Sequence, residues 1–112
     1  MIEVLKKSRD LILSGYCKGA IAKDGEGKNV SAIDPRARLF CAGGAVLRAC
    51  WDLDLSSLAG FDILLYLGKF LLPNTTLSQW NDEATTTATD VIALFDNAIA
   101  TLEKEKKLGE EA

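Results

Sequence analysis

The residues best suited to chemistry in this sequence are one cysteine and two short polar motifs. Cys17 is followed by a lysine, whose ammonium would favour the thiolate. Trp80, Asn81 and Asp82 are consecutive, and such a group can line a pocket in which the indole packs against a ligand and the polar pair orients it. Asp34, directly before a proline, completes the candidate binding set. The same patterns also fit a structural interpretation, which we favour: a buried thiol, a core tryptophan and two side chains that bind loop amides.

The absence of histidine limits the chemistry of the chain. Its 112 residues include three cysteines and no histidine. This composition excludes Ser-His-Asp and Cys-His nucleophiles, His-ligated zinc and a Cys₄ zinc site. The glycines of the 24–27 and 43–44 segments match neither a calcium loop nor a nucleotide-binding fingerprint. We therefore assign no catalytic residue, no metal and no cofactor, and favour a non-enzymatic protein.

Charge and hydropathy restrict the partners. Thirteen basic and sixteen acidic residues give a net charge of −3, without a basic stripe, so we expect no nucleic-acid partner. The longest apolar stretch, residues 63–72, falls short of the roughly 20 residues that cross a bilayer, and we expect no membrane contact. An odd number of cysteines without a signal-peptide pattern predicts reduced thiols in the cytoplasm.

The length allows a single domain, which we place at residues 1–108 with a loose tail at 109–112. Apolar periodicity predicts an amphipathic helix over residues 2–13, ended by Gly15. A turn cluster at 24–27 then predicts a small β-hairpin with flanks at 18–22 and 28–32.

The next two segments predict longer helices. Asp34 and Pro35 are a typical helix start, and the helix is expected over residues 35–52. Its small residues at 42–45 predict close packing against another helix or the hairpin backbone. A third helix, capped by Ser56 or Ser57 and bounded by Pro73, is apolar on every side. Such a helix is either central or shared with a second copy, and the sequence favours neither.

The candidate interface residues lie on that apolar helix. They are Ile63, Leu64, Leu67, Phe70 and Leu71.

Two capping signatures organise the end of the chain. The first, at residues 76–79, predicts a short helical turn ending near residues 81–82. The second, formed by Thr87 and Asp90, predicts a last helix from Ala88 to about Lys107. The fold class is therefore mainly α, with about four helices, a short helical turn and a hairpin-like insertion after the first helix.

The order of these motifs resembles a family of small uncharacterised proteins from bacteria and phages. The resemblance runs from about Leu5 to Ile99, and its residues are Gly15–Ala22, Asp24, Gly27, Asp34–Ala37, Phe40, Cys41, Gly44, Ala45, Leu77–Asp82, Val91, Asp96, Ala98 and Ile99. The chain departs from the family at residues 83–87 and in the bulky 63–72 run. The resemblance implies a helical single domain and no known activity.

Three functions follow as hypotheses. The first is a cytoplasmic, non-enzymatic interaction or accessory domain, homodimeric through the 63–72 helix or bound to an unidentified protein partner. The alternative is a small-ligand-binding or weakly enzymatic pocket lined by Cys17 and the 80–82 motif. A third hypothesis, an antagonist of a host or phage protein, depends on the resemblance alone.

Overall fold

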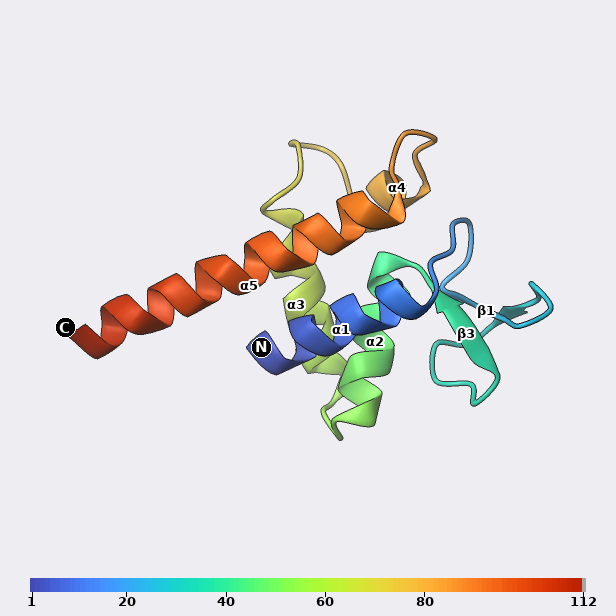
Figure 1. Cartoon of the computed structure of the whole chain (residues 1–112), viewed down its shortest axis with the longest axis horizontal. Helices are drawn as coiled ribbons and strands as arrows, with labels where there is room; N and C mark the ends of the chain where they lie inside the picture. The colour runs from blue at the N-terminus through green and yellow to red at the C-terminus, as the bar shows by residue number, and fades with distance from the viewer. Residues whose placement is uncertain (112) are drawn as a thin grey trace.

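Three helices build the centre of the molecule. The computed structural model describes residues 1–111, and within this range it contains five helices and one three-stranded sheet. Helix α1 (Ile2–Ser14) packs between α2 (Ala42–Asp52) and α5 (Ala88–Glu111) (Figure 1). The prediction of a mainly α fold with a small β insertion after the first helix is confirmed. No helix of residues 1–111 has the length and apolar character needed to span a bilayer.

The insertion is a small antiparallel sheet at one end of α1. Strands β1 (Ala22–Asp24) and β2 (Asn29–Val30) form the expected hairpin, although β1 begins where the predicted 18–22 flank ends. Strand β3 (Ala37–Phe40) pairs with the other edge of β1. In the turn, one carboxylate oxygen of Asp24 accepts hydrogen bonds from two backbone amides, those of Glu26 and Lys28, each at 2.9 Å. Two strands alone are marginal in water, and β3 supplies the contact that ties the hairpin to the helices.

The predicted helix over residues 35–52 is wrong in its first part. Asp34 does not cap a helix there, because its carboxylate accepts the Arg36 amide at 2.8 Å and folds residues 34–36 into a turn. Residues 37–40 then form β3, in which Ala37 and Phe40 are buried and Arg38 is exposed. The helix begins at Ala42, after Cys41, whose sulfur accepts a hydrogen bond from the Gly44 amide at 3.2 Å. The pairing of residues 37–40 with β1 therefore prevails over the helix start that Asp34 and Pro35 predict.

Of the two glycines of α2, Gly44 allows the close approach that the sequence predicts, whereas Gly43 makes an ordinary contact. A Cβ atom on Gly44 would lie 2.0 Å from the carbonyl oxygen of Ile21, in the loop that leads into the hairpin. A Cβ atom on Gly43 would meet a Leu64 methyl group at 3.8 Å, which is an ordinary contact. The backbone of the hairpin therefore packs on Gly44, and α3 packs beside Gly43.

The remaining helices follow their caps. Helix α3 (Ser57–Gly68) is capped by Ser56, and it ends earlier than the predicted limit at Pro73. Helix α4 (Leu77–Asp82) has the expected capping box, in which Thr76 and Gln79 bind each other's backbone amides. The Thr87–Asp90 pair also forms, directly before α5.

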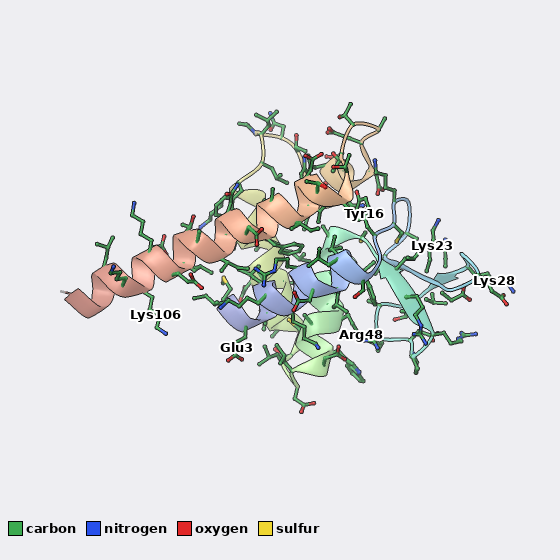
Figure 2. The ribbon with its side chains drawn as sticks, viewed as in Figure 1. Glu3, Tyr16, Lys23, Lys28, Arg48 and Lys106 are labelled. Carbon is green, nitrogen blue, oxygen red and sulfur yellow. The ribbon has the colours of Figure 1, made fainter. Side chains whose placement is uncertain are left out.

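Helix α5 is longer than predicted. It continues to Glu111, and its last turns project beyond the rest of the molecule, where Lys106 is labelled (Figure 2). The tail that we placed at 109–112 is therefore helical through residue 111, and residue 112 lies outside the described residues.

The glycine contacts give a matched pair of variants. We expect Gly44→Ala to lower the free energy of unfolding by about 2–4 kcal/mol, because its methyl group would overlap a backbone carbonyl. Gly43→Ala has room and gains helix propensity, so we expect it to be neutral or stabilising by up to about 1 kcal/mol. Urea titration followed by circular dichroism measures both. Equal stabilities would contradict the close contact.

Candidate functional site

One buried asparagine joins three parts of the chain. The Asn81 side chain is 1% exposed. Its Oδ1 atom accepts the Ala42 amide at 2.9 Å, and its Nδ2 atom donates to the Cys17 carbonyl oxygen at 3.2 Å and to a carboxylate oxygen of Asp82 at 3.0 Å. Each polar atom of the side chain therefore has a partner inside the chain. We call this cluster the Asn81 junction.

The backbone around residue 81 is held as well. The Tyr16 hydroxyl donates to the Asn81 carbonyl oxygen at 2.7 Å, and the Gly19 amide donates to Asp82 at 2.9 Å. Lys18 reaches the Glu83 carbonyl oxygen from the same loop. The 16–19 loop is in turn paired with β3, because Cys17 and Phe40 are joined by a backbone hydrogen bond of 3.1 Å.

The local sequence explains why these groups meet. The capping box at residues 76–79 starts α4, and one and a half turns later Asn81 faces the first turn of α2. The first amides of a helix have no partner within it. Asn81 satisfies the amide of Ala42 and Cys41 satisfies that of Gly44, so a side chain of α4 and the residue directly before α2 together cap the buried start of α2.

The electrostatics of the junction favour neutral thiol and phenol groups. Burial raises the pKa of Tyr16 to about 12, and the nearby Asp82 carboxylate adds to this shift. Burial also raises the pKa of Cys17 to about 11. The hydrogen bonds from Gly19 and Asn81 lower the pKa of Asp82. At neutral pH the cluster therefore holds a protonated thiol, a protonated phenol and one carboxylate.

The candidate binding residues are divided among three places. Cys17, Asn81 and Asp82 meet in the Asn81 junction. Trp80 instead lines a hollow of about 450 Å³ between α4, the segment that follows α3, and α5, together with Leu71, Glu83, Thr86, Asp90 and Leu94. Asp34 lies in the β2–β3 connection, where its carboxylate binds the Arg36 guanidinium at 2.9 Å and its pKa falls to about 2. Ligand binding by this set stays a prediction.

The candidate interface residues are divided too. Ile63 and Leu67 are buried in the core of the chain itself. Leu64, Phe70 and Leu71 are half-buried. The α3 side chains that do reach the surface are others, with exposed fractions of 72% for Leu58, 56% for Phe61 and 73% for Leu65.

An apolar groove runs beside this exposed part of α3. The α2–α3 groove has a volume of about 520 Å³ and is lined mainly by Ile21, Gly43, Leu47, Leu64, Leu65 and Gly68. A second hollow of about 470 Å³ shares Ile21 and Leu47 with it and adds the exposed side chains of Ile33, Trp51 and Leu55.

Sequence reasoning missed this surface although part of its signal was present. Leu58, Phe61 and Leu65 are spaced by three and four residues, which places them on one face of a helix. The glycine at position 60 marks the opposite face, where α3 approaches Leu47 and Cys50. The contribution of Ile21 had no such signal, because it depends on how the hairpin packs against α2.

Loss of the Asn81 side-chain amide should destabilise the fold. We expect Asn81→Ala to reduce the free energy of unfolding by about 2–4 kcal/mol, because it leaves the Ala42 amide and the Cys17 carbonyl group without partners. Ser78→Ala changes an exposed residue of the same helix and should have little effect. Chemical denaturation compares the two. A stability loss no larger than that of Ser78→Ala would contradict the structural role of the junction.

The Cys17 thiol should be unreactive in the folded protein. In a variant that retains only this cysteine (Cys41→Ser, Cys50→Ala), we expect disulfide exchange with an aromatic disulfide reagent at pH 8 to be more than tenfold slower than in denaturant, since the raised pKa keeps the thiolate rare. The rate should increase with pH towards about pH 11. A native rate equal to the denatured rate would show an accessible thiolate.

Comparison with known proteins gives a family. No curated protein and no solved structure matched the chain. A family model matches residues 1–101, from the start of the chain into the second half of α5. The matched range contains the whole Asn81 junction and the whole of α3. The chain belongs to DUF6197, a family of unknown function.

Proposed function

We propose that this protein is a non-enzymatic interaction domain of the cytoplasm that forms a homodimer through the outward face of α3. The observation that carries the proposal is the row of exposed apolar side chains at Leu58, Phe61 and Leu65, which we call the α3 stripe. A surface helix normally turns polar residues to water. This helix has a second apolar face opposite the one that it buries.

The surroundings enlarge the apolar area. Leu65 belongs both to the α3 stripe and to the α2–α3 groove, so the two surfaces are continuous. The groove continues at Ile21 and Leu47 into the hollow that contains Trp51. Contiguous apolar surfaces of this kind mark interaction sites in soluble proteins, whereas isolated exposed leucines need no explanation.

The polar residues support a structural role over a catalytic one. The groups that could have formed a reactive site are used in hydrogen bonds of the fold, because the Cys17 thiol donates to the Ala20 carbonyl oxygen and the Asn81 amide donates to the Cys17 carbonyl oxygen. A nucleophile needs an adjacent base or a lowered pKa, and burial moves the pKa of Cys17 in the opposite direction.

The energetics favour a dimer of moderate affinity. Fully burying one leucine or phenylalanine side chain contributes about 1.5–3 kcal/mol, and a two-fold interface uses the α3 stripe twice. Association costs an estimated 4–15 kcal/mol in lost freedom of motion. Six buried side chains contribute about 9–18 kcal/mol. The difference reaches the roughly 8 kcal/mol of a micromolar dissociation constant when the association cost lies towards the lower end of its range.

A single charge in the stripe should abolish the dimer. At tens of micromolar, light scattering should give about twice the monomer mass of 12.1 kDa for the natural chain. We expect Leu65→Glu to give a monomer with an unchanged circular dichroism spectrum, because position 65 is exposed and the glutamate would be buried only in the dimer. Leu13→Glu, at an exposed leucine of α1, is the matched control and should stay dimeric. A natural chain that remains monomeric would overturn the proposal.

A further inference from the structure

We infer that the two copies pack their α3 helices antiparallel about a two-fold axis near Leu65, with Asp62 of each copy paired with Lys69 of the partner subunit. This inference rests on the proposed function and specifies its partner and geometry. It follows from where Asp62, Gly68 and Lys69 lie around the α3 stripe, Lys69 being the residue directly after the helix, with helical backbone angles.

The stripe and its flanks follow from helix geometry. At 100° per residue, Leu58, Phe61 and Leu65 fall within about 60° of each other around the axis. The buried residues Ile63 and Leu67 lie on the far side. One flank of the stripe carries the charges Asp62 and Lys69, both exposed, and the other flank carries Leu64 and Gly68, which line the α2–α3 groove.

The two charges have opposite signs and lie two turns apart. Asp62 and Lys69 are separated by seven residues, or about 10 Å along the axis, on the same flank. The Lys69 ammonium lies 5.8 Å from the ring centroid of Tyr66, on this side of the helix. A two-fold axis perpendicular to the helices and close to Leu65 reverses the order of positions along α3. Asp62 of each copy therefore lies opposite Lys69 of the partner subunit, which gives two such pairs in the dimer.

A parallel arrangement lacks this match. A two-fold axis parallel to the helices brings the charged flank of one copy against the Leu64 flank of the other. Asp62 and Lys69 would then be desolvated against an apolar surface without forming an ion pair, which is unfavourable. The charge pattern of α3 thus complements its own antiparallel copy.

The position of Gly68 supports the same antiparallel register without reference to the charges. About the same axis, Phe61 lies opposite Gly68 of the partner subunit, and Leu65 meets its own equivalent. Gly68 borders the α2–α3 groove, and a Cβ atom placed on it would meet no other atom within 4 Å. A bulky ring therefore faces a residue without a side chain, which leaves room for the ring at helix distances of about 8–10 Å.

Charge exchange tests the arrangement. Asp62→Lys would place two cations together, and Lys69→Asp would place two anions together, so each should raise the dissociation constant by about tenfold. The double variant Asp62→Lys with Lys69→Asp restores both pairs with reversed polarity and should return to within about threefold of the natural chain. Analytical ultracentrifugation measures all four chains.

The outcomes separate this inference from the proposed function. Single variants that dimerise like the natural chain, or a double variant no better than the singles, would overturn the antiparallel pairing while the Leu65→Glu result still supported the dimer. A monomeric natural chain would overturn both and would leave the stripe to a different kind of partner.

A second variant tests the register without changing a charge. Gly68→Leu should fold normally, since its side chain has open space in the single chain. We expect it to weaken the dimer by more than tenfold, because it fills the place of the partner's Phe61. Unchanged dimerisation with normal folding would contradict the pairing of these two positions.

Discussion

The hydrogen bonds of Asn81 hold together the parts of the chain that are far apart in the sequence. The side chain forms hydrogen bonds to the first turn of α2, to the loop after α1 and to the end of α4, and so joins these three segments at one buried position. Because the buried start of α2 needs partners for its amides, this contact fixes α4 on α2. The loop that it holds leads directly into β1. The hairpin therefore packs on Gly44, and Ile21 becomes one wall of the α2–α3 groove.

Helix α3 lies on this framework with apolar side chains on two sides. Its inner side is complete, since Ile63 and Leu67 are buried and Gly60 lets the helix approach α2 closely. Its outer side is not covered by any part of residues 1–111 and bears Phe61 and Leu65. A helix that is apolar all round can be central or shared with another copy. Here one face of α3 is central, and the other is the face that we assign to the partner.

Local signals predicted most of the helices and the hairpin, but they missed the third strand of the sheet. The capping box at Thr76 and Gln79 is a short-range pattern, and it placed α4 almost to the residue. The Asp34-Pro35 pattern is just as local, yet residues 37–40 became a strand because β1 offered a long-range pairing partner. The same limit applies to the candidate site. Cys17, Asn81 and Asp82 do lie together, whereas Trp80, directly beside Asn81, points into a different hollow because neighbours on a helix face different directions.

The sequence by itself determined the fold class, the helix caps and the chemistry that the chain lacks, because composition, periodicity and capping are properties of neighbouring residues. It excluded histidine-based catalysis outright. Only the tertiary structure decided which face of α3 is buried, that the polar motifs bond to each other and that Ile21 and Leu47 share a groove. These are long-range facts, since burial depends on which surfaces the folded chain brings into contact.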